Sequence, residues 1–283
     1  MQALYDVPAP AKINLFLHVV GQLADGYHLI QSVFTMVDWC DTLHFELRSD
    51  GQLSREDLGD PLPAEDLILR AAKALQSATG CTRGAHIGVL KRIPAQAGLG
   101  GGSSDAASTL LALNRLWRLN LKRAELETIG AKLGADIPFF VRGQTAWVEG
   151  IGDLITPLPA DICPPPSRYL IVKPEAGIDT KSIFSSKFLK RDTKPATMQV
   201  FAAMHDEFGC NDLQPVACKM QASVAEALQW LDQKTLAARM TGSGSAVFAK
   251  ISDCFVLTEL PQGWIAKQCE SLNVHPLIGW TSN

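Results

Sequence analysis

A glycine-rich stretch at residues 94–105, Pro-Ala-Gln-Ala-Gly-Leu-Gly-Gly-Gly-Ser-Ser-Asp, constrains the fold of this chain most strongly. Four of the five residues at 98–102 are glycine, which frees the backbone for positive φ angles and lets a ligand approach without side-chain hindrance. We expect a short strand over 86–91 before it. After it, Ser-Ser-Asp at 103–105 is expected to cap an apolar helix that runs to about Leu119. Such an arrangement builds an anion site, because unpaired N–H groups and the helix dipole converge there.

The spacing within this loop excludes two common nucleotide motifs. No Lys-Ser or Lys-Thr pair follows the last glycine, so the loop is not a Walker A motif. Ser103 stands where a dinucleotide fingerprint has its third glycine. A flexible surface loop that caps a helix is the alternative interpretation. The two serine hydroxyls at the helix start favour a loop that holds phosphate.

Length and charge limit the class of protein. A chain of 283 residues favours two domains, and the proline-dense stretch at 157–166 places their boundary between residues 1–158 and residues 159–283. The net charge of −3 argues against a nucleic-acid or anionic-membrane partner. No apolar run approaches the ~20 residues of a membrane helix, and Lys12 and Asn14 interrupt the first apolar run, so no signal peptide is expected.

Cysteine usage indicates the compartment. The chain has seven cysteines without any Cys-x-x-Cys pair. This pattern predicts free, mostly buried thiols in a reducing cytosol, and neither disulfides nor a zinc site. A cytoplasmic location follows as the expectation.

Two charged residues stand in ordered local patterns. Residues 11–20 alternate between apolar and polar, which predicts a half-buried strand with Lys12 and Asn14 on the same face. Lys12 alone would be a solvated edge lysine. Asp136 precedes Ile-Pro-Phe-Phe, and Pro138 suits the first turn of a helix that Asp136 would cap. A carboxylate held beside an apolar wall is the other interpretation of Asp136.

Further elements follow from periodicity and breakers. Strands are expected at 31–37, 41–47, 145–150 and 169–172, a loop at 49–63, a helix opened by Asp66, helices at 122–133 and 215–231, and a glycine-serine hairpin turn within 240–249.

Four segments, in their order along the chain, resemble the motifs of the GHMP superfamily of small-molecule kinases. They are Pro-Ala-Lys-Ile-Asn-Leu at 10–15, the glycine loop, Gly-Ala-Asp-Ile-Pro at 134–138, and Thr-Gly-Ser-Gly-Ser at 241–245. Within this superfamily, Asp-Gly-Tyr-His at 25–28 and Asn-Asp-Leu at 211–213 are similar to the branch whose alcohol substrate is carried on a cytidine diphosphate. The match covers nearly the whole chain in register. Two positions depart from the pattern: Gln96, where a small residue or glycine is common, and Asp66, where an asparagine is expected near the adenine.

The resemblance implies a two-domain α+β fold. The N-terminal half would resemble ribosomal protein S5 domain 2 and the C-terminal half a ferredoxin-like layer, with ATP and the cytidyl diphosphate substrate meeting in the cleft between them. The implied activity is ATP-dependent phosphorylation of an alcohol, with ATP and Mg²⁺ as cofactors and with Mg²⁺ ligands that the sequence leaves unknown. Kinases of homoserine, mevalonate or a sugar, and a non-catalytic sensor of the same fold, are the alternatives. The oligomeric state, monomer or dimer, stays open.

The resemblance also implies roles for individual residues. Asp136 would be the catalytic base and Lys12 its cation, because phosphoryl transfer to an alcohol needs a destination for the proton and neutralisation of charge on the phosphoryl group, and a close ammonium keeps a carboxylate ionised. The ATP-binding residues would be Asp66 and Lys91 near the adenine, and Pro94, Ala95, Gln96, Ala97, Gly98, Leu99, Gly100, Gly101, Gly102, Ser103 and Ser104 around the triphosphate. The substrate-binding residues would be Asn14 and His28 as hydrogen-bonding groups, Tyr27 and Phe184 stacked on the cytosine, and Thr180.

Overall fold

The computed structural model describes residues 2–64, 66–205 and 207–282. Its strands join in one sheet whose main path runs β3-β4-β2-β10-β7-β9-β8, while β1 and β5 pair with β2 and β6 pairs with β5. The strands are β1 (Ala3–Gln22), β2 (His28–Arg48), β3 (Leu53–Asp57), β4 (Gly84–Leu90), β5 (Ala146–Glu149), β6 (Leu154–Pro157), β7 (Arg168–Lys173), β8 (Leu236–Met240), β9 (Val247–Ile251) and β10 (Ile265–Leu272). The helices are α1 (Leu67–Thr79), α2 (Gly101–Leu116), α3 (Arg123–Ala131), α4 (Ile137–Arg142), α5 (Thr180–Phe184), α6 (Met198–Met204), α7 (Gln214–Met220), α8 (Ala222–Asp232) and the short 3₁₀ turn η1 (Ile278–Trp280).

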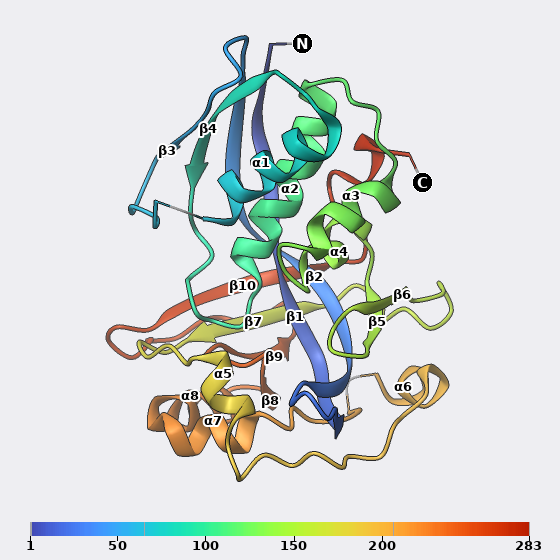
Figure 1. Cartoon of the computed structure of the whole chain (residues 1–283). Coiled ribbons are helices and arrows are strands. Elements are labelled where there is room, and N and C mark those ends of the chain that lie inside the picture. The colour runs from blue at the N-terminus through green and yellow to red at the C-terminus, as the bar shows by residue number, and fades with distance from the viewer. Residues whose placement is uncertain (1, 65, 206, 283) are drawn as a thin grey trace.

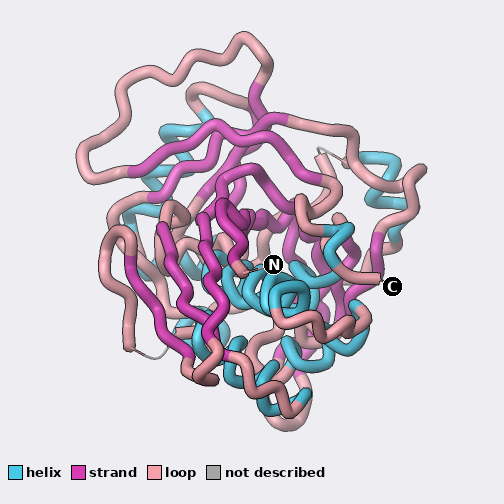
Figure 2. The backbone as a smooth tube through the Cα atoms, turned by 90° about the horizontal axis from the view of Figure 1, so that it is seen from above, coloured by secondary structure: helices cyan, strands magenta, loops and turns pink. Residues whose placement is uncertain are grey.

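The molecule has two halves joined by its longest strands. Helices α1 to α4 accompany β3, β4 and the first part of β1 in one half, and α5, α7 and α8 accompany β7, β8 and β9 in the other (Figure 1). Strands β1 and β2 extend through both halves (Figure 1). Strand β10 closes the connection, because Ser271 and Leu272 pair with Val37 and Met36 of β2. Both chain ends lie in the half that holds α1 to α4 (Figure 1). In the view from above, the N-terminus lies near the centre of the molecule and the C-terminus nearer its right side (Figure 2).

Strand β1 is buried on both faces, so the prediction of a half-buried strand is wrong. All residues from 11 to 19 are buried, including Lys12 with 4% of its surface exposed. Helix α2 packs against β1 in the N-terminal half, while Leu17 and Val19 join the apolar core of the C-terminal half. The pairing of β1 with β2 shifts between Asn14 and Leu17. This irregularity breaks the simple alternation on which the prediction was based.

Several local predictions are confirmed and others need correction. Asp66 opens helix α1 as expected, and α3 lies within the predicted range 122–133. The predicted strands at 31–37 and 41–47 are one strand, β2, and the predicted loop at 49–63 contains β3, which pairs in parallel with β4. The predicted helix at 215–231 is interrupted at Gln221, which has extended backbone angles and separates α7 from α8.

The structure tests the expected state of the cysteines and the expected absence of a membrane helix. All seven cysteines are free. The expectation that most are buried is wrong, because Cys269 is buried, whereas Cys210 and Cys254 are exposed and the remainder are partly buried. None of the helices in the described part of the chain has the length and apolarity that a bilayer crossing requires.

Candidate active site

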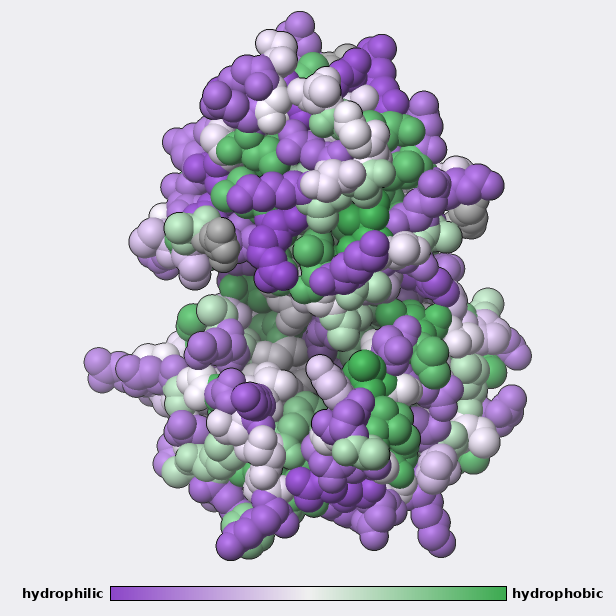
Figure 3. Space-filling model, in the orientation of Figure 1, coloured by the Kyte–Doolittle hydropathy of each residue, from purple (hydrophilic) through white to green (hydrophobic). Residues whose placement is uncertain are grey.

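A cavity of about 700 Å³ brings together most of the predicted site residues. It opens in the hollow between the two halves of the molecule, where pale and apolar residues face the viewer (Figure 3). The predicted residues that line it are Lys12, Asn14, Asp66, Lys91, Pro94, Ala95, Gln96, Ala97, Gly98, Leu99, Gly100, Gly101, Gly102, Ser103, Asp136, Thr180 and Phe184. Ser104, Tyr27 and His28 are not in its lining.

Lys12 is a buried cation at the centre of this cavity wall. Its Nζ donates to Oδ1 of Asn14 at 2.6 Å and lies 3.8 Å from Oδ2 of Asp136. The same ammonium lies 4.5 Å from the centre of the Phe34 ring, which is a cation–π contact. Burial lowers the pKa of Lys12, and the charge of Asp136 opposes that shift. The edge-lysine interpretation is therefore wrong, since Lys12 is enclosed with a carboxylate, an amide and an aromatic face.

Asp136 stands at the start of α4, but it does not cap that helix. It occupies the N-cap position with Pro138 in the first turn, yet its side chain makes no hydrogen bond to the helix. Its backbone angles are φ −81° and ψ −13°, whereas a capping residue has extended angles. The side chain is 30% exposed and faces Lys12. The carboxylate therefore lies at the cavity with oxygen lone pairs that the helix does not use.

The glycine loop leads into α2 without a side-chain cap. Helix α2 begins at Gly101, with Gly100 in a left-handed conformation at the N-cap and no side-chain cap bond. Ser103, Ser104 and Asp105 lie inside the helix, which corrects the prediction that they cap it. The loop is fixed to strand β1, since the Lys12 N–H donates to the carbonyl of Leu99 at 2.9 Å. Backbone N–H groups of the first turn thus remain available beside the cavity.

The second glycine-serine turn, residues 241–246, packs directly on the first loop. The N–H groups of Ser245 and Ala246 donate to the carbonyls of Gln96 and Ala97, at 3.3 and 3.1 Å. Thr241 Oγ1 accepts from the Asn14 N–H at 2.9 Å. The turn does connect two paired strands, β8 and β9. It also carries Gly242, Ser243 and Gly244 into the cavity wall, which the local sequence pattern did not predict.

Lys91 is held by two carboxylates: Asp41, which the sequence did not single out, and Asp105, which the sequence predicted only as part of a helix cap. Its Nζ contacts Oδ2 of Asp105 in α2 at 2.5 Å and also pairs with Asp41 of β2. The other oxygen of Asp41 accepts from the N–H groups of Arg92 and Ile93, at 2.5 and 2.8 Å. This cluster, Asp41–Lys91–Asp105, ties the start of the glycine loop to a strand and a helix.

Both carboxylate oxygens of Asp66 have partners. Oδ1 accepts from the Leu69 N–H at 3.0 Å and so caps α1. Oδ2 pairs with Nη1 of Arg55 at 2.7 Å. The side chain lies in the cavity wall, but its charge is already compensated by Arg55.

Of the other predicted substrate residues, Phe184 and Thr180 line the cavity, and His28 packs on Phe184. The His28 and Phe184 rings are 5.1 Å apart between centres, and Nε of Arg191 donates to Nε2 of His28 at 2.9 Å. The hydroxyl of Thr180 bonds that of Ser243 at 2.7 Å. Tyr27 lies in the turn between β1 and β2 and is 62% exposed. Arg191 had no local signal in the sequence, because its contact with His28 joins segments more than 150 residues apart.

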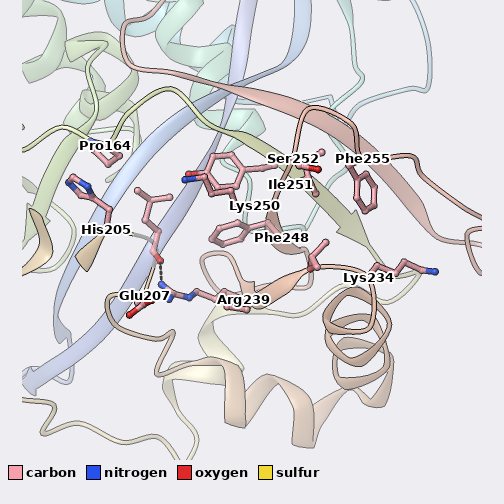
Figure 4. A pocket seen from close by; sticks show the side chains of 14 residues that line it. Pro164, His205, Glu207, Lys234, Arg239, Phe248, Lys250, Ile251, Ser252 and Phe255 are labelled. Atoms are coloured by element: carbon pink, nitrogen blue, oxygen red, sulfur yellow. Dashed lines mark hydrogen bonds between the residues drawn. The ribbon is translucent and has the colours of Figure 1, made fainter. Parts of the chain in front are cut away.

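A second cavity of about 830 Å³ lies beside β8 and β9 in the C-terminal half (Figure 4). Arg239 projects into it and donates to the carbonyls of Leu15 and Phe208, at 2.9 and 2.6 Å. None of the predicted site residues lines this cavity. The larger cavity thus lies away from the predicted chemistry.

Two family models match this chain. The chain matches the GHMP kinases N terminal domain over residues 66–144 and the GHMP kinases C terminal domain over residues 195–253. It is 62% identical to the 4-diphosphocytidyl-2-C-methyl-D-erythritol kinase of Paracidovorax citrulli, covering 100% of this chain and 99% of that protein. It is 61% identical to the enzyme of the same name from Delftia acidovorans, covering 99% and 98%.

Solved structures agree with this assignment. A crystal structure of 4-(cytidine 5'-diphospho)-2C-methyl-D-erythritol kinase, 28% identical, superposes with a TM-score of 0.75 over 93% of this chain and 98% of that one. A mevalonate kinase, 14% identical, shares the fold, with a TM-score of 0.68 over 95% of this chain and 99% of that one. The two-domain α+β architecture expected from the motifs is therefore confirmed. The chain belongs to the 4-diphosphocytidyl-2-C-methyl-D-erythritol kinase family of GHMP kinases.

Proposed function

We propose that this chain transfers the γ-phosphoryl group of ATP to the 2-hydroxyl of 4-diphosphocytidyl-2-C-methyl-D-erythritol, in the non-mevalonate route to isoprenoid precursors. The observation that carries the proposal is the Lys12–Asp136 pair, in which a buried ammonium faces a carboxylate that its own helix does not use. Full-length identity of 55–62% to enzymes of that name supports this substrate over homoserine, mevalonate or a sugar.

The pair has the groups that the reaction needs. The substrate oxygen forms a bond to the γ-phosphorus while the bond from that phosphorus to the β–γ bridging oxygen breaks, which releases ADP. The hydroxyl proton passes to the carboxylate of Asp136, and the ammonium of Lys12 offsets negative charge on the transferred group. Asn14 fixes the position of Lys12, because its Oδ1 accepts from Nζ and its Nδ2 donates to Ser32 Oγ. One amide hydrogen of Asn14 then remains for the substrate.

The loop at 94–104 would hold the triphosphate through backbone N–H groups and the N-terminus of α2. The positive φ of Gly98 and Gly100 keeps the loop backbone close to the cavity. Asp66 and Lys91 lie in the wall where the adenine would sit. The Lys91 ammonium is already paired with Asp41 and Asp105, so we assign it to shaping this wall. We assign Asp66 to the adenine amino group, because a carboxylate oxygen keeps a second lone pair beside the one that the Leu69 N–H or Arg55 uses.

The other end of the cavity would hold the cytidyl group. His28, Phe184 and Thr180 surround that end, and Tyr27 lies in the exposed turn that directly precedes β2. We assign Tyr27 and Phe184 to stacking on the cytosine ring and His28 to hydrogen bonding with it.

A magnesium ion fits this site as a companion of the nucleotide. Mg²⁺ is usually held by one or two carboxylates together with substrate phosphates. Within the described residues no three His, Cys, Asp or Glu side chains gather into a cage. The Asp136 carboxylate, which makes no cap bond, and the Ser103 hydroxyl are oxygen donors at the cavity that suit such an ion. When bound, Mg²⁺ would neutralise charge on the β- and γ-phosphates.

Two organisational features complete the proposal. We place the boundary between the two domains at residues 158–159, in the proline-dense stretch that precedes β7. We place the reaction in the cytoplasm, since all seven thiols are free.

A substrate panel tests the proposal. ADP release should occur with the cytidyl diphosphate substrate and stay at background with homoserine, mevalonate and galactose. Replacing Asp136 by Asn removes the proton acceptor, and kcat should fall by roughly 10²-fold or more. Lys12→Ala should lose a similar factor, and the double variant should lose less than the product of the two, because the residues act as a unit. Near-normal turnover of the Asn variant would remove Asp136 from its role.

A further inference from the structure

Arg191 joins two segments at the cytidyl end of the cavity, and all three nitrogens of its guanidinium donate hydrogen bonds there. Nε donates to Nε2 of His28 at 2.9 Å. Nη1 donates to the carbonyl of Leu189 at 2.9 Å, and Nη2 donates to the carbonyls of Phe184 and Ser186 at 3.2 and 2.8 Å. The side chain thus connects the first residue of β2 to the segment that follows α5.

This contact determines which nitrogen of His28 carries the hydrogen. A guanidinium has donors and no acceptor. Nε2 of His28 must therefore offer its lone pair to Arg191, so the hydrogen of the neutral ring is on Nδ1. Burial and the nearby charge of Arg191 both lower the pKa of His28, which keeps the ring neutral. The ring is thus a neutral Nδ1–H tautomer.

Nδ1 is left as the free donor of that ring. Among the described residues it has no hydrogen-bond partner, and it is not among the side-chain atoms that are sealed from solvent without one. The ring packs on Phe184, which lines the cavity. A fixed N–H group therefore stands beside the place assigned to the pyrimidine.

We propose that Arg191 is a positioning residue that locks His28 as an Nδ1–H donor, and that this lock selects cytosine over uracil. The inference rests on the proposed function, which brings His28 to the base. At the ring position N3, cytosine has a lone pair and accepts a hydrogen bond, whereas uracil carries a hydrogen there. The Nδ1–H group can therefore donate to N3 of cytosine, whereas at N3 of uracil it meets another donor. A donor left unpaired in the site disfavours binding of the uracil ligand strongly.

The bond arrangement also explains why arginine is needed. Only a branched, planar donor can reach the imidazole and three carbonyl oxygens at once. The carbonyl contacts fix the guanidinium plane, so Nε keeps pointing at His28. Lysine at this position would concentrate its donors on one atom and could not make the same set of bonds.

The test compares Arg191→Met with a matched control, Lys190→Met, which removes a positive charge from the neighbouring exposed residue. Nitrogen-15 NMR of the ligand-free proteins reports which nitrogen of His28 carries the hydrogen. Steady-state kinetics compare the cytidine diphosphate-linked substrate with its uridine diphosphate-linked analogue. Thermal unfolding of both variants reports the stability cost separately.

We expect the wild type and Lys190→Met to show hydrogen on Nδ1 and to prefer the cytidyl substrate. Arg191→Met should place hydrogen on Nε2 in part of the population, raise KM for the cytidyl substrate about tenfold and reduce the cytosine preference by a similar factor, with a smaller change in kcat. Hydrogen on Nε2 in the wild type would overturn the inference whether or not the variant folds. An unchanged cytosine preference in a folded Arg191→Met protein would also overturn it. If the wild type fails to phosphorylate the cytidyl substrate at all, the proposed function fails, and the NMR measurement still decides the tautomer.

Discussion

Gly98 is the point where the glycine loop and the turn at 241–246 come closest, and we expect Gly98→Ala to disrupt both. A Cβ atom built on Gly98 would lie 2.3 Å from the carbonyl oxygen of Thr241 and 3.1 Å from the nitrogen of Gly244. Both are backbone atoms, so no side-chain rotation relieves the overlap. The φ angle of +73° adds a conformational penalty for any residue with a Cβ.

The magnitude follows from these two costs. The left-handed conformation costs roughly 1–2 kcal/mol. Moving the turn away breaks the bonds from Ser245 and Ala246 to the loop carbonyls, at about 0.5–1.5 kcal/mol each. We therefore expect Gly98→Ala to lower the free energy of unfolding by on the order of 3 kcal/mol. Because the loop would move with the turn, KM for ATP should rise at least about tenfold.

Gly102→Ala is the matched control in the same loop. Gly102 lies in α2, and a Cβ there would meet only Leu67 Cδ1, at 3.6 Å. Alanine is better than glycine inside a helix by about 0.5–1 kcal/mol, so this variant should be as stable as the wild type or more stable. Urea unfolding of both variants measures the difference. Equal stability of Gly98→Ala and Gly102→Ala would refute the reasoning that the two turns are in tight backbone contact.

Three further predictions concern single residues. Tyr27→Ala should raise KM for the cytidyl substrate about tenfold while Tyr27→Phe stays close to wild type, because stacking on a base contributes about 1–3 kcal/mol; an unchanged KM in the Ala variant would remove Tyr27 from the site. Burial, with added repulsion from Asp41, raises the pKa of Asp105 to about 7, so the native state binds a proton that the unfolded chain releases near pH 4. The free energy of unfolding of the wild type, compared with that of Asp105→Asn, should then fall as pH rises from about 4 to 7. Urea unfolding measures both free energies, and a difference between them that stays constant with pH would contradict this. Asp66→Asn should leave KM for ATP unchanged or lower it, and it should weaken discrimination against GTP. The reason is that an ionised aspartate can accept a hydrogen bond from the adenine amino group and cannot pair with the guanine carbonyl. Equal use of GTP and ATP by the wild type would place base recognition elsewhere.

The motifs predicted the family and the fold because they are local. A glycine loop before a helix and an Asp-x-Pro start can each be read within a few residues. For the same reason, the local pattern predicted two strands, at 31–37 and 41–47, where the structure has the single strand β2. Asp38 in their gap interrupts the apolar pattern, yet Val37 and Cys40 on either side of it both pair with β1, and its carboxylate accepts from the Glu270 N–H of β10.

Contacts over long distances along the chain lay outside local prediction. Asp41 and Asp105 meet Lys91 only after a strand, a loop and a helix are assembled. Arg191 reaches His28 across 163 positions. Gln96 has a φ of +51°, in the left-handed region where glycine alone carries no penalty, so this departure leaves strain in the loop. Glycine, one of the residues expected at this position, would remove that strain.

Asp66 and Asp136 show how tertiary surroundings decide between two uses of the same residue type. Both stand at the N-cap of a helix, but Asp66 has extended backbone angles and caps Leu69, while Asp136 has helical angles and caps nothing. A capping bond contributes only about 1 kcal/mol. Leaving a buried ammonium without its counter-charge costs about 3–5 kcal/mol. The partly exposed carboxylate of Asp136 offsets a part of that cost, and Asn14 and the Phe34 ring contribute the rest of the environment of Lys12. Because pairing the buried ammonium matters more to stability than one capping bond, the carboxylate turns from the helix to the cation, which is the conflict with local rules expected at a functional site.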